Sequence, residues 1–387
     1  MSFDVIVIGL GAMGSAAAYE LARRGARVLG IEAYTPAHEL GSSGGLTRII
    51  RLAYFEHPDY VPLLRAAWES WPSLAAEAGD DLLLQTGGLY IGRRGSAVLE
   101  GSLASARQHG LEHELLDAAE SNRRFPALRL DDDMQTLYEP LAGILFAQRC
   151  IAAHLRLAAA HGAELRFEER VAGWTSGDGG LAVTTDRGTY QADKLVIAAG
   201  PWLASLVPGL DLPLTVERNP LFWFEPTATP KLLAPDRLPV WIMELDPDHA
   251  FYGFPALAAG RDGSPAQGVK VARHHGGRSV DPESVEREAT AADEAVVRGF
   301  IERHMPVANG RRLDARVCMY TNTPDFNFIL DFHPADQRVV IASPCSGHGF
   351  KFSNVIGRVA ADLLLEGTTP FEIGFLSLDR FGSTTHV

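Results

Sequence analysis

The sequence predicts an α/β protein in which a domain with a parallel sheet, assembled from separate stretches of chain, carries an inserted β-rich domain. Residues 4–32 read as a strand, a glycine-rich turn, a helix and a second strand. Two short runs of buried-strand type, Lys194–Ala199 and Val339–Ser343, come much later and suit the same sheet. Between them, residues 212–317 change to strand patterns such as LFWFEP and VWIMEL. Such patterns favour an antiparallel, β-rich second domain.

The first element, residues 4–32, reads DVIVIGLGAMGSAAAYELARRGARVLGIE. Its glycine-rich turn and helix start consist of Gly9, Gly11, Ala12, Met13 and Gly14. Gly9 makes the tight turn, Gly11 lets backbone approach a pyrophosphate, and Gly14 lets the helix pack on the strand. The free N–H groups and the dipole at the helix start favour the negative charge of that pyrophosphate.

Glu32 follows the second strand of this unit. Its carboxylate would accept a hydrogen bond from a ribose hydroxyl, and an acid at this position argues against a 2′-phosphate and therefore against NADP. Strand, turn, helix, strand and acid in register predict a dinucleotide site, whereas a merely tight βα turn would leave Glu32 unexplained.

The remaining elements outside residues 212–317 follow in order along the chain. The patterns predict a helix from about Val61, a strand over 86–92, a helix over 150–161, strands over 164–167, 180–185 and 188–191, and a helix over 352–366. Asp186-Arg187 is expected at the turn of a hairpin. The Ala/Gly/Pro-rich stretch 256–267 is expected to be an exposed loop.

Composition limits the classes of function. The 387 residues suggest about two domains, and 46% hydrophobic with 21% charged residues is typical of a globular protein. A net charge of −13 argues against nucleic acid or an anionic membrane as partner. The three cysteines, Cys150, Cys318 and Cys345, are far apart, without metal-ligand spacing. With neither a signal-like segment nor a long apolar run, we expect a cytoplasmic protein.

Residues 41–51 form the first of three segments with unusual residues, GSSGGLTRIIR. Small residues such as Ser42 and Ser43 let backbone come close to a large flat ligand. Arg48 and Arg51 would share a face if this segment were helical. The alternative is a solvated surface loop with two ordinary arginines.

The second segment is Gly268–His275, in which Lys270 alternates with valines and would share a strand face with His274. The alternative is a solvent-facing lysine. The third segment joins CMYTNTPD at 318–325 to CSGHGFK at 345–351. Its Gly-His-Gly turn at a helix start is a candidate anion site. Lys351 stands there against the helix dipole, which hints at function, although a solvated lysine and a buried structural Cys318 remain alternatives.

Together these residues make the chain resemble the monomeric sarcosine oxidase family of flavoproteins, which includes N-methyltryptophan oxidase and pipecolate oxidase. The motifs that carry the resemblance are the N-terminal fingerprint, TRIIRLAY, FYGFP, the lysine strand, CMYTNTPD and SGHGFK. The resemblance covers nearly the whole chain. It implies a discontinuous Rossmann-like FAD-binding domain over 1–85, 145–211 and 318–387. The inserted antiparallel β-rich substrate domain would take 86–144 and 212–317.

The resemblance also implies the cofactor and its ligands. FAD would be attached covalently, through a thioether from Cys318 to the flavin 8-methyl carbon, with Arg48 beneath the flavin. Cys345 is expected only to pack near the flavin. The cofactor-binding residues expected are Gly9, Gly11, Ala12, Met13, Gly14, Glu32, Ser42, Ser43, Arg48, Val171, Gly200, Trp202, Cys318, Gly347, His348, Gly349, Phe350 and Lys351.

Further residues match the family's catalytic positions. The resemblance implies that Arg51 and Lys351 hold a substrate carboxylate and that Lys270 lies over the flavin and promotes its reaction with oxygen. The remaining pocket residues expected are His274, Tyr252, Met243 and Tyr320. The loop between Tyr252 and Lys270 looks longer than in typical members, which leaves the size of the substrate open.

The function implied is flavin-dependent oxidation of a secondary amine, with sarcosine or another N-methyl amino acid as the first choice. The imine would hydrolyse to formaldehyde and an amino acid, while oxygen becomes hydrogen peroxide. Alternatives are a cyclic imino acid (pipecolate or proline), N-methyltryptophan, or a dehydrogenase with another electron acceptor. A non-catalytic flavin-binding module or an NAD(H) dehydrogenase would leave Lys270 or Cys318 unexplained. The partners expected are a small amine and O2, with the chain as a monomer.

Overall fold

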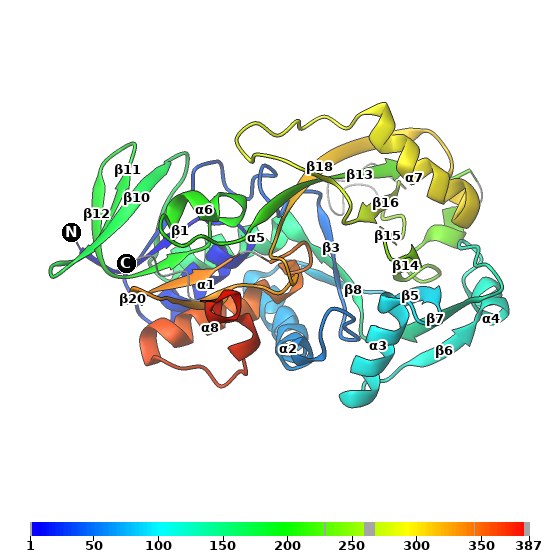
Figure 1. The fold of residues 1–387 in the computed structure, drawn as a ribbon, viewed down its shortest axis with the longest axis horizontal. Coiled ribbons are helices and arrows are strands. Elements are labelled where there is room, and N and C mark those ends of the chain that lie inside the picture. The colour runs from blue at the N-terminus through cyan, green and yellow to red at the C-terminus, as the bar shows by residue number, and fades with distance from the viewer. Residues whose placement is uncertain (1, 228–229, 259–267, 344, 383–387) are drawn as a thin grey trace.

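The computed structural model describes residues 2–227, 230–258, 268–343 and 345–382. It has two lobes, each built on a large sheet, and a small sheet between them (Figure 1). Among the described residues, no helix is both long and apolar enough to span a membrane.

The sheet of the first lobe has a parallel centre. Its path runs β10-β11-β12-β1-β2-β9, and β20, which pairs with β19, joins at β12. The strands are β1 (Ser2–Ile8), β2 (Val28–Ile31), β9 (Glu164–Arg166), β10 (Val171–Gly177), β11 (Gly180–Thr185), β12 (Thr189–Ile197), β19 (Leu330–His333) and β20 (Asp336–Ala342). The last four residues of β1 and all of β2 are buried, because helices or strands cover both faces. The predicted strands over 188–191 and 194–199 are one continuous strand, β12.

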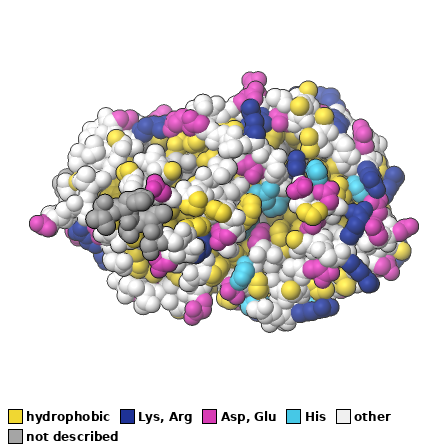
Figure 2. Space-filling view, in the orientation of Figure 1, with side chains coloured by type: hydrophobic (Ala, Val, Ile, Leu, Met, Phe, Trp, Pro, Cys, Tyr) yellow, Lys and Arg dark blue, Asp and Glu magenta, His cyan; other side chains and the backbone are white. Residues whose placement is uncertain are grey.

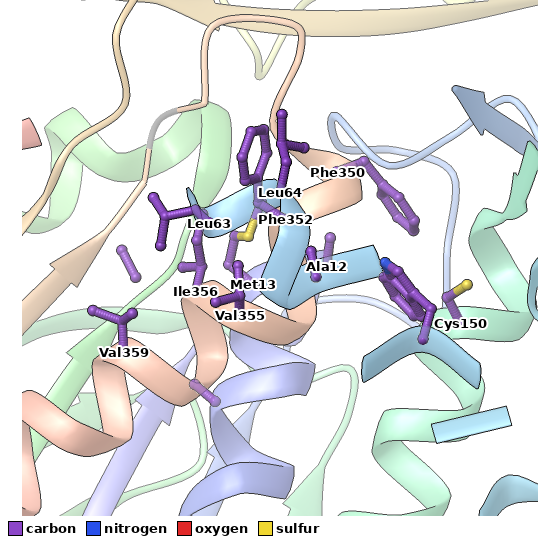
Figure 3. Packing of buried hydrophobic residues seen from close by; sticks show 14 of the residues in the cluster. Ala12, Met13, Leu63, Leu64, Cys150, Phe350, Phe352, Val355, Ile356 and Val359 are labelled. Atoms are coloured by element: carbon purple, nitrogen blue, oxygen red, sulfur yellow. The ribbon is translucent and has the colours of Figure 1, made fainter. Parts of the chain in front are cut away.

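Helices cover one face of this sheet with a shared apolar core. They are α1 (Ala12–Arg23), α2 (Val61–Ala78), α5 (Ala147–Ala160) and α8 (Ser353–Glu366), while the short α6 (Leu203–Leu206) lies beyond β12. Figure 3 shows side chains of α1, α2 and α8 converging beneath the short turn at 350–352. The packing fixes the start of α1 against the start of α8, and both of these ends face the site described below.

The second lobe is a mixed sheet in the order β17-β13-β16-β15-β14-β5-β7-β6, with β18 beside β13. Its strands are β5 (Gly88–Arg93), β6 (Glu114–Asp117), β7 (Met134–Glu139), β13 (Thr215–Phe224), β14 (Val240–Asp246), β15 (His249–Phe254), β16 (Val269–His274), β17 (Arg278–Ser279) and β18 (Arg312–Asn322). Every pair is antiparallel, as expected, except β14 with β5. Helices α3 (Ala97–Gln108), α4 (Ala118–Arg124) and α7 (Ala291–His304) pack around it, and Phe300 of α7 stacks on Trp241. Acidic and basic side chains alternate over the right-hand end of the molecule in Figure 2. Ion pairs of the second lobe include those of Arg93 with Asp131 and Asp133.

A small sheet joins the lobes. It consists of β3 (Thr47–Ile50), β8 (Gly143–Phe146) and β4 (Leu83–Gln85). The segment with Arg48 and Arg51 is therefore a strand and its end, not a helix.

The predicted boundary at 317/318 falls inside β18, which pairs along its whole length with β13. Of the predicted exposed loop 256–267, residues 259–267 lie outside the described part. In the described start of the loop Leu257 is buried and Ala258 is exposed.

Candidate active site

The first of two adjoining cavities lies at the carboxyl ends of β1, β2 and β12 and encloses about 1330 Å³ of space. Ligands of open α/β sheets bind at this edge. Fourteen of the expected cofactor-binding residues line it: Gly9, Gly11, Ala12, Met13, Glu32, Ser42, Ser43, Arg48, Val171, Gly200, Trp202, Gly347, Gly349 and Phe350. Segments more than 300 residues apart in sequence thus form one wall.

The glycine turn has the close approaches that its motif predicts. Gly9 has φ +83°, and a Cβ there would lie 2.6 Å from the carbonyl oxygen of Ala198. A Cβ on Gly14 would lie 1.7 Å from the carbonyl oxygen of Gly9. No side chain caps the start of α1 at Gly11, so the N–H groups there can bind an anion in the cavity.

Glu32 is buried and holds this turn as well as lining the cavity. Its Oε2 accepts from the N–H of Leu10 at 2.8 Å, and its Oε1 accepts from the N–H of Tyr34 at 3.2 Å. His38 Nε2 lies 3.2 Å from Oε1. The carboxylate is therefore fixed at the end of β2, where the sequence predicts contact with a ribose.

Four buried polar atoms in this wall have no hydrogen-bond partner among the described residues. They are Ser42 Oγ, Glu169 Oε2, Trp202 Nε1 and Thr321 Oγ1. Because an unpaired buried polar group costs free energy, these atoms fit a ligand that carries hydroxyl or phosphate groups. Together with the free N–H groups of α1, they make the cavity suitable for a dinucleotide. Thr321 was not foreseen, although it directly follows Tyr320 in the CMYT motif.

The second cavity adjoins the first and encloses about 690 Å³ of space. Arg48, Tyr320, Gly347 and Phe350 line both cavities. A group bound at this shared wall is therefore exposed to both. Of the expected pocket residues, the second cavity brings together Arg51, Lys351, His274, Tyr252, Tyr320, His348 and Cys318.

Arg51 is a buried cation of the second cavity, with 5% of its surface exposed. Its Nη2 donates to both carboxylate oxygens of Glu56, at 2.5 and 2.7 Å, and its Nη1 donates to the carbonyl of Ala53 at 3.2 Å. The rings of Tyr54 and Phe55 lie 4.2 and 4.4 Å from the guanidinium carbon. Burial tends to raise the pKa of Glu56, but the charge of Arg51, with that of Lys351 and the hydrogen bonds from Arg51, outweighs it and lowers the pKa. Glu56 was not predicted, although it stands only five residues after Arg51.

Lys351 is also 5% exposed, and its Nζ donates to the carbonyl of His348 at 2.5 Å. Burial, reinforced by the charge of Arg51, holds the pKa of Lys351 well below its usual value. Two buried basic residues thus line this space, and Glu56 pairs with one of them, Arg51. Such a site attracts a carboxylate.

His348 supports this site as a neutral group. Its Nε2 donates to the carbonyl of Phe326 at 2.9 Å, so its Nδ1 accepts from the hydroxyl of Tyr54 at 2.5 Å. Burial lowers the pKa of His348 to about 3. His348 lines the second cavity and its carbonyl positions Lys351, and its cofactor contact stays a prediction.

Another part of the second cavity is lined by Tyr252, His274 and Tyr320. The ring centre of His274 lies 6.0 Å from that of Tyr252 and 5.9 Å from that of Tyr320. Burial raises the pKa of both tyrosines and, with the charge of His275, lowers that of His274. All three side chains are therefore held neutral and give the amine end of a substrate a surface without charge.

Met243 does not line the cavity, and this prediction is wrong. Its side chain is fully buried in the core of the second lobe. Side chains alternate along β14, so Ile242 faces the cavity instead, across from Tyr252 in the register of β14 and β15. The sequence pattern located the strand but did not show which of its alternating side chains face the cavity.

Lys270 is 2% exposed and is not among the residues lining the described part of either cavity. Its Nζ donates to the carbonyls of Gly45 and Thr47 at 2.7 and 3.0 Å and lies 4.5 Å from the ring centre of Phe254. The solvated-lysine alternative is therefore excluded. The charge is held just behind β3, next to Arg48.

Cys318 lines the second cavity, beside Arg48 of the shared wall. Its Sγ lies 3.5 Å from Nη2 of Arg48 and 3.3 Å from the carbonyl of Ser42. Cys345 lines the first cavity, and burial raises the pKa of its thiol to about 12. All three cysteines are free, and among the described residues no cluster of potential ligands could hold a metal ion.

Comparison with known proteins agrees with this geometry. The profile of the family "FAD dependent oxidoreductase" matches residues 4–363. The chain is 42% identical over 383 residues to the monomeric sarcosine oxidase of Streptomyces avermitilis, which covers 99% of this chain and 98% of that protein. It is 34% identical to the N-methyl-L-tryptophan oxidase of Salmonella dublin, covering 98% and 100%.

Among solved structures, NikD, described as an unusual amino acid oxidase essential for nikkomycin biosynthesis, superposes with a TM-score of 0.84 at 28% identity. The match covers 97% of each chain. The predicted α/β architecture with its Rossmann-like sheet is confirmed. The chain belongs to the FAD-dependent oxidoreductases and is a full-length relative of the sarcosine and N-methyltryptophan oxidases.

Proposed function

We propose that the protein is an amine oxidase of N-methyl amino acids, with sarcosine as its first candidate substrate. One observation carries the proposal: two buried cations, Arg51 and Lys351, line a small cavity that shares a wall with the cofactor cavity. The names of its relatives point to the same substrates.

The two cations would hold the substrate carboxylate and thereby orient its N–CH3 group toward the shared wall. Arg51 offers two parallel N–H donors, and Lys351 adds a second charge. Glu56 now occupies one side of the guanidinium, so an incoming carboxylate would share Arg51 with it or displace it. Fixing the carboxylate in this way aligns the reacting bond and removes much of the entropic cost of reaching the transition state.

The amine must lose its proton before it can be oxidised. The cavity favours this loss because burial and two neighbouring cations disfavour an ammonium group. Tyr252, His274 and Tyr320 give that end neutral surroundings. Bound FAD would accept a hydride from the carbon beside the nitrogen and pass two electrons to O2. The imine product adds water to give formaldehyde and glycine, and O2 leaves as H2O2.

We also propose that FAD is bound covalently through Cys318. The support is the position of the thiol, which lines the second cavity and lies 3.5 Å from the guanidinium of Arg48, a residue of the wall shared with the first cavity. Denaturation in acid tests this: flavin should stay with the wild-type chain and be released from Cys318→Ser. The matched control is Cys345→Ser, which should retain it. Release from the wild type would exclude the attachment.

The deciding experiment is aerobic incubation of the yellow protein with sarcosine, followed by assays for H2O2 and formaldehyde. Both products in equal amounts support the proposal. Loss of flavin colour without air, but no H2O2 in air, would make the protein a dehydrogenase with another acceptor. If sarcosine leaves the flavin oxidised, pipecolate and N-methyltryptophan are the next substrates, and reaction with either would replace sarcosine.

We also propose that the protein is a monomer in the cytoplasm. The name of its relative describes a monomer, and three free cysteines are suited to a reducing compartment. Size-exclusion chromatography with light scattering tests the first part, since a single species near 42 kDa is expected.

A further inference from the structure

A buried glutamate outside the predicted site, Glu139, contacts the chain segment that carries Arg51. Glu139 ends β7 in the second lobe and is 1% exposed. Its Oε1 accepts from the N–H of Leu52 at 2.9 Å, and its Oε2 accepts from the N–H of Ala53 at 2.7 Å. One carboxylate thus binds both peptide N–H groups that follow Arg51, across the boundary between the small sheet and the second lobe.

The same carboxylate also reaches the second cavity. Tyr90, whose ring lines that cavity, donates its hydroxyl to Oε1 of Glu139. This approach requires Gly88, because a Cβ on Gly88 would lie 2.7 Å from the Tyr90 hydroxyl. Burial raises the pKa of Glu139, while its hydrogen bonds from Tyr90, Ala53 and Leu52 oppose that rise.

A continuous path of contacts leads from Glu139 to the guanidinium. Glu139 fixes the N–H of Ala53, and the carbonyl of Ala53 accepts from Nη1 of Arg51. The guanidinium carbon also lies 5.8 Å from the centre of the Tyr90 ring. Both routes end on the group that would hold the substrate carboxylate.

We propose that Glu139 is a positioning residue for substrate binding: it fixes residues 51–53 and Tyr90 so that the guanidinium of Arg51 is presented to the second cavity. The inference rests on the proposed function in assigning a carboxylate substrate. An amide in place of this carboxylate has one acceptor oxygen, so one of the two N–H groups would face an NH2 group.

The test is Glu139→Gln, with Glu244→Gln as its matched control. Glu244 is a second buried carboxylate that accepts from two consecutive N–H groups, those of Ala97 and Val98, but at the start of α3. We expect Glu139→Gln to raise KM for sarcosine about 10- to 100-fold, as loss of a charge-assisted hydrogen bond implies, with kcat changed far less. The control should leave KM unchanged.

A double-variant cycle separates positioning from general damage. In an Arg51→Ala background, Glu139→Gln should have no further effect on kcat/KM. Equal effects in both backgrounds, or a KM effect as large in Glu244→Gln, would overturn the inference. If Glu139→Gln does not fold, Tyr90→Phe enters the same cycle and must be equally dependent on Arg51.

A separate measurement distinguishes this inference from the proposed substrate. Acetate should bind to the cation site and perturb the visible absorbance of the flavin, whichever amine is oxidised. Weaker acetate binding in Glu139→Gln than in Glu244→Gln supports the inference even if sarcosine is not oxidised. Equal acetate affinity in the two variants would overturn it.

Discussion

At the scale of single residues, the second cavity is defined by buried positive charge. Arg51 keeps its charge at any accessible pH, whereas Lys351 has a pKa well below its usual value because of burial and the charge of Arg51. The charged form of Lys351 is therefore present at low pH and is lost as pH rises through this lowered value. The site then retains one cation for the substrate carboxylate.

We accordingly expect KM for sarcosine to rise on the alkaline side, at a pH below the ordinary value for lysine. Lys351→Met should have a high KM from the start and no such alkaline rise. Measuring kcat and KM from pH 6 to 10 checks this expectation. The same alkaline rise in Lys351→Met would show that another group titrates.

Lys270 gives a second prediction at this scale. Its buried ammonium, held by the carbonyls of Gly45 and Thr47, lies behind the strand that carries Arg48. A fixed positive charge there stabilises negative charge that develops on oxygen. We expect Lys270→Met to slow reoxidation of the reduced enzyme by O2 at least ten-fold and to leave anaerobic reduction by substrate nearly unchanged. Stopped-flow absorbance separates the two half-reactions, and slower reduction with normal reoxidation would contradict this role.

The residues that the sequence could not predict share a physical reason. Whether Met243 or Ile242 faces the cavity depends on the phase of β14, and both faces of that strand are apolar. Glu139 belongs to no pattern of spacing, because its partners Leu52 and Ala53 come from a distant segment. Glu56 lies close to Arg51 in sequence, but only the folded chain shows that the two side chains pair. By contrast, the sequence could predict that Arg51 and Lys351 belong to one site, because the resemblance to a known family implies that these two motif positions come together.

At the scale of elements, the glycine turn and helix α1 were predictable because their backbone geometry demands particular residues. A Cβ on Gly14 would overlap the carbonyl oxygen of Gly9, so Gly14→Ala should destabilise the fold and prevent FAD binding. Gly299, exposed in the interior of α7, has no atom within 4 Å of an added Cβ. Gly299→Ala should therefore stabilise the protein by about 1 kcal/mol. Urea unfolding of the pair measures both, and equal effects would contradict the steric argument.

Other elements could not be foreseen from local pattern. The break expected between residues 191 and 194 does not exist, because Ala192 is buried and β12 runs from its hairpin with β11 into the central sheet. The parallel contact of β14 with β5 joins strands about 150 residues apart, which no local signal reports. The local sequence pattern could predict that these strands exist, whereas their pairing depends on the whole fold.

At the scale of the whole molecule, the two-lobe arrangement follows from the insertion that the sequence indicated. The proposed domain division remains an interpretation, since β18 continues from the second lobe into the cofactor wall: Phe222 pairs with Ala315, and Asn219 pairs with Cys318. This strand, together with the small sheet, makes the lobes mechanically continuous at the site. Binding in the first cavity should therefore affect the stability of the entire chain.

Cofactor binding should accordingly act as a global stabiliser. The first cavity is lined by segments from the first 50 residues, from 151–206 and from 320–350. A ligand bound there therefore contacts all three segments at once and adds to the contacts that they make with one another. The Cys318→Ser variant, which should release FAD, allows the protein to be prepared without it. Its thermal midpoint should rise with added FAD, because a ligand present at 100 times its Kd stabilises by about 2.7 kcal/mol. A midpoint independent of FAD, or a first transition that FAD leaves unshifted, would mean that the lobes unfold separately.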